Sequence, residues 1–210
     1  NPYDFLFFLK EISISNPYIL IEVPDFEWIK LKQTFFDITY EHVNYFTMET
    51  FENLFSKKLF YKKKVFGKQY LLVIAKLNNL NKDYKKTIKC KNLPIDKIFP
   101  NLIKQIKSYN NINQNIYIWG AGTKGLMFLI YLKKLNPRIF KNVKFAIDID
   151  KKKHNKFLQI VDVRIISPEK LLKLIKNNDT IIVANSNYLK EIQKYVEKAK
   201  FKKINYKCID

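Results

Sequence analysis

The pair Glu41-His42 carries the residue types that general acid–base chemistry requires. Histidine titrates near neutral pH, so its imidazole can take up or release a proton under working conditions. A neighbouring carboxylate can orient the ring or raise its pKa. Tyr40 and Tyr45, in the same aromatic stretch DITYEHVNYF, offer neutral hydroxyl donors that would stabilise a developing oxyanion. The alternative is a loop histidine that caps or hydrogen-bonds locally, beside tyrosines that serve as hydrophobic anchors.

A second set of residues with chemical meaning is Gly120-x-Gly122-x-x-Gly125, which holds three of the four glycines in the chain. The spacing predicts that Gly120 permits a tight turn, Gly122 lets a phosphate approach the backbone, and Gly125 lets a helix and a strand pack closely. The N-terminus of that helix would face an anion. Asp148 ends the next predicted strand, where dinucleotide-binding folds place a ribose-binding acid. A turn that serves only helix–strand packing is the alternative.

Alternating strands and helices would position this glycine turn. Apolar runs predict five strands, with the sequences NIYIWG, VKFAIDI, VRII, TIIVAN and INYKCI. Helical periodicity predicts helices over residues 123–135, 168–177 and 187–200, and Ser167 before Pro168 is a helix start signal. The alternation predicts a parallel, doubly wound α/β domain over residues 115–210. Only 85 residues follow Gly125, which counts against a complete NAD-dependent dehydrogenase.

The preceding part, residues 1–79, reads as helix, strand, loop, helix and two strands. Its first helix is predicted over residues 3–14, and the apolar run over 18–24 suits a buried strand. After a polar and aromatic loop, Thr47 is a helix cap, and Gly67-Lys68 separates the strands of a hairpin. Residues 80–114 are rich in Asn and Lys and are predicted to form a linker with one helix.

The net charge of +20 comes almost entirely from lysine, because Arg138 and Arg164 are the only arginines. Residues 1–50 are acidic, with three lysines and eight acidic side chains. The lysines form no arginine-rich stripe and accompany no nucleic-acid motif, so we expect a solvated basic surface and no specific nucleic-acid partner. No apolar run is long enough to span a membrane, and no signal peptide is visible. We therefore expect a cytoplasmic protein.

Metal and disulfide chemistry are not expected. The two cysteines, Cys90 and Cys208, form no CxxC pair, and the chain has only two histidines, so no ligand spacing for a metal is present. His154, in the lysine-rich stretch DKKKHNK, is predicted to be a solvated turn residue. The sequence begins with Asn inside a predicted helix, and we expect it to be an excerpt or a split gene product.

The order of these pieces resembles a known family. ILIEVPDFEW followed by FFDITYEHVNYFTMETFENLF is similar to the end of the catalytic domain of S-adenosylmethionine (SAM)-dependent methyltransferases that act on nucleotide-linked sugars. IYIWGAGTKGLMFLIYL, FAIDIDKKKHNKFL and VRIISPEKL resemble the C-terminal domain of the same C-methyltransferase family. The Glu-His-x-x-Tyr-Phe and Gly-Ala-x-x-Lys-Gly elements are the most specific parts of the resemblance.

The resemblance implies the closing part of an incomplete class I methyltransferase domain over residues 1–79, followed by a Rossmann-like domain over 115–210. It implies that His42, beside Glu41, removes a proton from the carbon that accepts the methyl group, with Tyr40 and Tyr45 as oxyanion donors. The family often has Tyr two positions before the Glu, where this chain has Thr39, so which tyrosine acts stays open.

For the Rossmann-like domain, the resemblance implies that it holds a nucleotide-linked sugar. The substrate-binding residues would lie at the glycine turn and at the end of the next strand: Gly120, Ala121, Gly122, Lys124, Gly125 and Asp148. The cofactor would be SAM, bound mostly outside this chain, because the family's glycine-rich SAM loop and its zinc module have no counterpart here. We therefore expect the chain alone to be inactive and to need a SAM-binding half or a homo-oligomer partner.

Two other interpretations stay open at the level of sequence. The chain could be a stand-alone nucleotide-binding module that uses the glycine turn without catalysis. It could also be a basic protein that binds polyanions through charge alone, in which case binding would disappear as the salt concentration rises.

Overall fold

The structure is a computed structural model, and it describes residues 1–39, 42–84, 94–199 and 203–209. The chain divides into two compact units. One consists of Asn1–Thr34 with Tyr40–Ile98, and the other consists of Phe35–Thr39 with Phe99–Asp210. The boundary between Ile98 and Phe99 lies inside the segment that the composition predicts as a linker.

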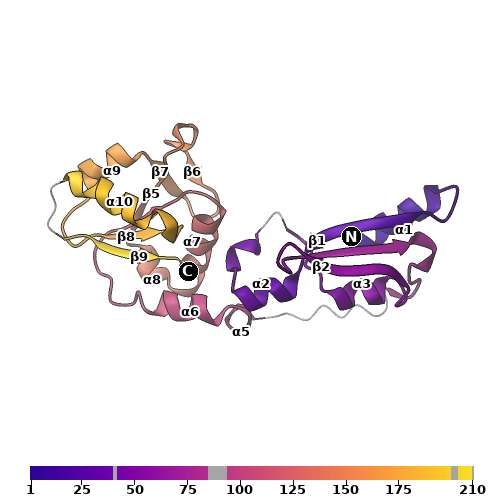
Figure 1. Cartoon of the computed structure of the whole chain (residues 1–210). Helices are drawn as coiled ribbons and strands as arrows, with labels where there is room; N and C mark the ends of the chain where they lie inside the picture. The colour runs from indigo at the N-terminus through magenta and orange to yellow at the C-terminus, as the bar shows by residue number, and fades with distance from the viewer. Residues whose placement is uncertain (40–41, 85–93, 200–202, 210) are drawn as a thin grey trace. The chain divides into compact units, whose positions relative to one another are not determined.

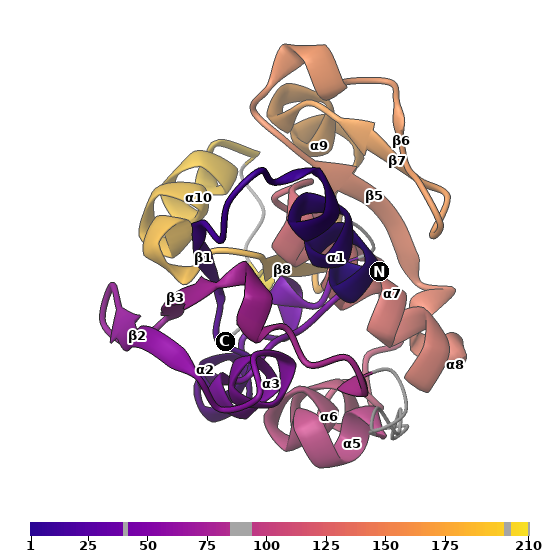
Figure 2. The same ribbon diagram turned by 90° about the vertical axis from the view of Figure 1, so that its right-hand side faces the viewer.

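The first unit is built on a three-stranded antiparallel sheet. Its elements in chain order are α1 (Pro2–Ile12), β1 (Tyr18–Pro24), α2 (Phe26–Lys32), α3 (Met48–Leu54), β2 (Leu59–Val65), β3 (Tyr70–Lys76), the 3₁₀ helix η2 (Leu77–Asn79) and α5 (Ile95–Ile98). β3 lies between the other two strands, and Figure 2 shows β1, β3 and β2 side by side in that order. The predicted first helix, first strand and hairpin are confirmed, with helix ends that differ by one or two residues.

One face of this sheet carries the core of the first unit. The alternating residues Leu71, Val73 and Ala75 of β3 are buried, as the two-residue period of a strand requires. They pack against apolar side chains of α1 and α3: Tyr3, Leu6, Phe51, Leu54 and Phe55. The prediction of a buried strand at 18–24 is wrong in one respect. β1 is an edge strand whose exposed and half-buried residues alternate, because helices of the described part of this unit cover only the core face.

Two N-caps fix the helices around the segment that contains His42. Thr47 and Thr50 form a capping box at the start of α3, so the predicted helix start at Thr47 is confirmed. α2, by contrast, lies where we predicted a loop. Its cap is the fully buried Asp25, whose carboxylate accepts the Glu27 N–H at 3.0 Å and pairs with the Lys64 ammonium.

We predict that Asp25→Ala lowers the free energy of unfolding by about 2 kcal/mol, because the helix loses its cap and Lys64 loses its buried partner. Asp25→Asn should cost less, because an Asn oxygen still caps the helix. Urea denaturation of both variants measures the difference. Equal losses for Asn and Ala would show that the cap contributes nothing.

The second unit is built on a six-stranded sheet. Its elements in chain order are the 3₁₀ helix η1 (Phe35–Asp37), α6 (Pro100–Lys107), β4 (Ile116–Trp119), α7 (Thr123–Leu135), α8 (Pro137–Phe140), β5 (Val143–Ile147), η3 (Lys151–Lys153), β6 (Phe157–Leu158), β7 (Val163–Ile166), α9 (Pro168–Leu174), β8 (Thr180–Val183), η4 (Ser186–Tyr188), α10 (Leu189–Val196), η5 (Glu197–Ala199) and β9 (Asn205–Cys208). The strand order is β6-β7-β5-β4-β8-β9.

The sheet of the second unit is parallel from β7 to β9, with β6 antiparallel at its edge. The chain starts at the central strand β4, moves outward through β5 and β7, and then crosses back to β8 and β9. α9 and α10 lie on one side of the sheet and α7 on the other, as Figure 1 shows. The predicted doubly wound α/β fold is therefore confirmed. The order in which the chain adds strands reverses between the neighbouring parallel strands β4 and β8.

Local sequence explains why these elements form where they do. All four residues of β8 are buried, as expected for a central strand with helices on both faces. α9 begins as predicted, because the Ser167 hydroxyl accepts the Lys170 N–H at 3.2 Å and Pro168 occupies the first turn. α7 spans the predicted residues 123–135, and its apolar side chains Phe128 and Leu132 are fully buried.

Candidate functional site

The glycine turn lies between β4 and α7, and packing requires two of its three glycines. Gly120 has a φ of +111°, and its N–H donates to the carbonyl oxygen of Ile147 at 2.8 Å. A Cβ at Gly120 would lie 2.9 Å from the Cβ of Ala184, and a Cβ at Gly125 would lie 2.1 Å from the carbonyl oxygen of Gly120. Only glycine at position 125 therefore lets α7 begin this close to β4.

Gly122 differs from its neighbours, because no packing contact requires a glycine there. Among the described residues, nothing beyond its own helix and chain neighbours lies within 4 Å of the place where its Cβ would be. Gly122 is the N-cap of α7 and provides no side-chain hydrogen bond to the first turn. The first N–H groups of a helix have no partner within the helix, so an uncapped and open start is suited to an anion.

Ala121 and Lys124 are both held within the second unit. The buried N–H of Ala121 donates to Oδ2 of Asp148 at 3.1 Å. The Lys124 ammonium lies 5.1 Å from the ring centroid of Phe36, a cation–π contact with η1. η1 belongs to the short segment of residues 35–39 that joins this unit, which the sequence did not predict.

Asp148 follows β5 and its carboxylate is held by three donors. Besides the Ala121 N–H, it accepts the Asp150 N–H at 2.9 Å and the Lys153 ammonium at 2.8 Å. Burial is the largest single influence and raises the pKa of Asp148, but the hydrogen bonds and the charge of Lys153 together lower the pKa below its ordinary value. The carboxylate is therefore ionised at neutral pH and ties the end of β5 to the glycine turn.

His154 lies in a turn, as predicted, but its ring is not simply solvated, because it also contacts Asp148. The ring is half-buried, and its Nε2 lies 2.8 Å from the carbonyl oxygen of Asp148. The contact forms because the short helix η3 turns the chain back toward the end of β5. The loop after β5 thus directs both Lys153 and His154 back at Asp148.

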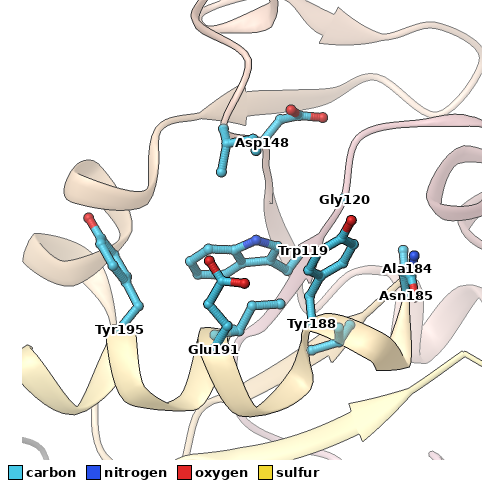
Figure 3. A pocket seen from close by; sticks show the side chains of 11 residues that line it. Trp119, Gly120, Asp148, Ala184, Asn185, Tyr188, Glu191 and Tyr195 are labelled. Carbon is cyan, nitrogen blue, oxygen red and sulfur yellow. The ribbon is translucent and has the colours of Figure 1, made fainter.

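A pocket of about 330 Å³ opens beside this turn, at the carboxyl ends of β4, β5 and β8. It lies at the point where the strand order reverses, which is where open α/β sheets bind ligands. Gly120 and Asp148 line it, so two of the predicted residues meet at a cavity. Figure 3 shows the side chains that complete it, which come from the end of β4, from the residues after β8, from η4 and from α10; those not predicted from the sequence include Trp119, Asn185, Tyr188, Glu191 and Tyr195.

The sequence contains a weak signal for these additional residues. Asn185 follows the apolar run of β8 at the strand's carboxyl end, where polar ligand contacts are expected in this fold. Tyr188, Glu191 and Tyr195 are spaced by three and four residues, which places them on one face of a helix. Periodicity alone does not tell which face of α10 borders a pocket.

His42 and Tyr45 lie in the first unit, on the segment between η1 and α3. His42 is exposed, whereas Tyr45 is half-buried with its ring 5.7 Å from that of Phe26. The segment is fastened at Phe46, whose carbonyl oxygen accepts the Phe26 N–H at 2.9 Å and whose ring stacks on Phe51. The other two predicted catalytic residues, Tyr40 and Glu41, lie outside the described residues.

The described residues form neither a metal site nor a membrane span. No three His, Cys, Asp or Glu side chains gather where they could hold a metal ion. Within the same residues, no helix has both the length and the apolar composition needed to cross a membrane.

The strand order and the glycine turn define the second unit as a Rossmann-like α/β domain. Residues 87–206 match the family described as the C-methyltransferase C-terminal domain, and the chain belongs to this family. The match covers more than half of the chain and gives it a methyltransferase-related role. No curated protein matches the chain in sequence.

We predict that Gly125→Ala destabilises the fold much more than Gly122→Ala, because packing requires a glycine only at the first of these positions. Gly125→Ala should lower the free energy of unfolding by about 3 kcal/mol or more, because its Cβ would collide with a backbone oxygen. Gly122→Ala should change it by less than about 1 kcal/mol, because the space is open. Urea denaturation followed by circular dichroism measures both. A large loss for Gly122→Ala would assign that glycine to packing as well.

Proposed function

We propose that the chain is part of a SAM-dependent methyltransferase that acts on a nucleotide-linked sugar, with the second unit holding the nucleotide-sugar. The observation that carries the proposal is a ligand pocket at the strand-order reversal of a domain from a C-methyltransferase family. The open backbone at Gly122 supports it, because a diphosphate could approach the start of α7 there.

The first unit supports a methyltransferase role in a different way. In the order of a class I methyltransferase domain, β1 would be the fifth strand, and β2 with β3 would be the closing antiparallel pair. β2 and β3 form such a pair, and β3 joins it to β1. The other edge of β1 pairs with no strand of the described residues, so it is available to the strands that would complete the sheet.

The first unit does not contain the residues that would hold SAM. Such a site needs a glycine-rich turn between a strand and a helix, and the glycine of this unit, Gly67, lies in the β2–β3 hairpin. The methyl group would come from SAM bound by a half that this chain does not supply. We therefore propose that the chain alone transfers no methyl group.

The part of the reaction proposed for this chain is proton removal. A sugar carbon becomes a nucleophile when it lies next to a carbonyl and loses its proton to give an enolate. His42 would take that proton on a ring nitrogen, since histidine is a base near neutral pH. Its exposed position leaves the ring accessible to a substrate. Tyr45 would donate its hydroxyl to the enolate oxygen.

The second candidate is a stand-alone nucleotide-binding module without catalysis. The glycine turn, Asp148 and the pocket alone would account for it, because all of them belong to one unit. This candidate assigns no chemistry to the segment that carries His42.

We predict that the chain binds a dTDP- or UDP-linked sugar in calorimetric titrations and that Gly122→Phe weakens this binding at least 10-fold. A bulky side chain at the open start of α7 would occupy the place of the diphosphate, while the open space there preserves the fold. Gly67→Ala, in the β2–β3 hairpin, is a glycine control outside the second unit; the positive φ of +64° strains this substitution locally, but it should leave binding by the second unit unchanged.

Parallel titrations with NAD and with S-adenosylhomocysteine separate the alternatives. NAD binding without nucleotide-sugar binding would contradict the proposal and favour a dinucleotide module. Tight binding of S-adenosylhomocysteine would show that the SAM site has been placed in the wrong half.

The role of His42 can be tested without methyl transfer. We predict that the chain, incubated with a nucleotide-linked ketosugar in D₂O, exchanges the hydrogen on the carbon next to the carbonyl, as followed by NMR. His42→Gln should slow this exchange by about 100-fold or more, because general-base catalysis contributes about that much. Asn44→Ala, a change at an exposed residue of the same segment, is the control and should retain it. Equal exchange in the His42 variant would remove histidine from the mechanism.

A further inference from the structure

The charges around the pocket are opposite to those that a phosphate requires. Two carboxylates line it, those of Asp148 and Glu191, and none of the described lining residues is a lysine or an arginine. A diphosphate inside this space would be repelled, whereas hydroxyl and N–H groups would find acceptors. Asp148 already accepts hydrogen bonds from three donors of the protein. Glu191 is therefore the carboxylate with more acceptor capacity for the hydroxyl and N–H groups of a ligand.

Aromatic rings form the walls of the same pocket. The rings of Trp119 and Tyr195 lie 5.9 Å apart at 74°, an edge-to-face contact that fixes both. Burial raises the pKa of the Tyr195 phenol, and the charge of Glu169 and a hydrogen bond to it raise the pKa further, so the hydroxyl stays a donor to that carboxylate. Tyr188 lines the pocket with 56% of its surface exposed, so its ring is accessible to a ligand.

The size of the pocket selects the part of a ligand that fits. About 330 Å³ is at the low end of the range of about 300–1,000 Å³ for small-molecule sites, so it accommodates one flat ring with an attached sugar. The open start of α7 at Gly122 follows two residues after Gly120, which lines the pocket. A ligand could place its neutral end in the pocket and its phosphates at that helix start.

Resting on the proposed function, we propose that this pocket binds the nucleoside end of the nucleotide-sugar. The base lies against Trp119 and Tyr188, and the hydroxyls of the nucleoside sugar donate to Glu191, which Figure 3 shows projecting from α10 toward the pocket. The diphosphate stays outside, and the sugar that accepts the methyl group extends beyond it. Glu191 is thereby a specificity-determining residue, because its charge admits a nucleoside and repels a phosphate.

Titration calorimetry of the full chain with UDP-glucose, uridine and inorganic pyrophosphate tests the proposal. Glu191→Gln should weaken the binding of UDP-glucose and of uridine about 10-fold, because a neutral amide oxygen replaces a charged acceptor, and it should not weaken the binding of pyrophosphate. Glu197→Gln, the same charge change on an exposed residue outside the pocket, should leave all three unchanged. Tyr188→Ala should weaken the binding of uridine at least 10-fold, because the stacking contact is lost. Since Tyr188 is exposed, this variant should remain folded, which circular dichroism checks.

The sign of the Glu191→Gln effect is decisive. Tighter binding of UDP-glucose in this variant would overturn the proposal, because it would place a phosphate in the pocket. Unchanged binding in both Glu191→Gln and Tyr188→Ala would overturn it as well, and in that case retained nucleotide-sugar binding would leave the proposed function intact.

Titrations with adenosine and with S-adenosylhomocysteine show whether a failure concerns the nucleoside site or the proposed substrate. If they bind with the same dependence on Glu191 and Tyr188 while UDP- and dTDP-sugars do not bind, the pocket is a nucleoside site and the proposed substrate is wrong. If the pyrimidine nucleotides bind with that dependence, both proposals are supported.

Discussion

The close approach of α7 to β4 is the contact on which the candidate site depends. It is possible only because position 125 has no side chain, since a Cβ there would lie 2.1 Å from the carbonyl oxygen of Gly120. The approach places the Ala121 N–H where it can donate to Asp148 and so joins the ends of β4 and β5. The parallel pairing of β4 with β5 and with β8 brings the carboxyl ends of these strands together, and the close approach of α7 sets the uncapped helix start at Gly122 beside the pocket.

The arrangement also separates two kinds of ligand chemistry over a short distance. The pocket presents aromatic rings and the carboxylate of Glu191, whereas the helix start presents backbone N–H groups without a side-chain cap. A molecule with a neutral flat end and an anionic middle satisfies both, and a nucleotide-linked sugar is such a molecule. Two described lysines of this region are held by the protein itself: the Lys124 ammonium lies over the Phe36 ring, and the Lys153 ammonium donates to Asp148.

Most of the second unit could be predicted from the sequence, because its main strands are short apolar runs and two of its helices follow recognisable start signals. The glycine turn located α7, and Ser167-Pro168 located the start of α9, which ends three residues before the predicted residue 177. α10 is shorter than the predicted 187–200, because short 3₁₀ helices flank it on both sides. α2 was missed because apolar and charged residues alternate over its short length and show no clear helical period, although Asp25 was a usable cap signal. The pocket was found only in part, because the packing of α10, not its sequence, decides that Tyr188 and Glu191 face the strand ends. Residues 35–39 belong to the second unit, where the Phe35 ring contacts that of Tyr131. No local sequence pattern predicts this contact.

The central claim, that a nucleotide-sugar binds at the strand-order reversal of the second unit, can be tested by following the indole N–H signals in a ¹H–¹⁵N spectrum. The chain has two tryptophans, Trp119 in the pocket and Trp28 in α2 of the first unit, so each gives one signal and Trp28 is an internal reference. The account predicts that adding a UDP- or dTDP-linked sugar shifts the Trp119 signal and leaves the Trp28 signal in place. A bound nucleotide-sugar that leaves the Trp119 signal unmoved would contradict it.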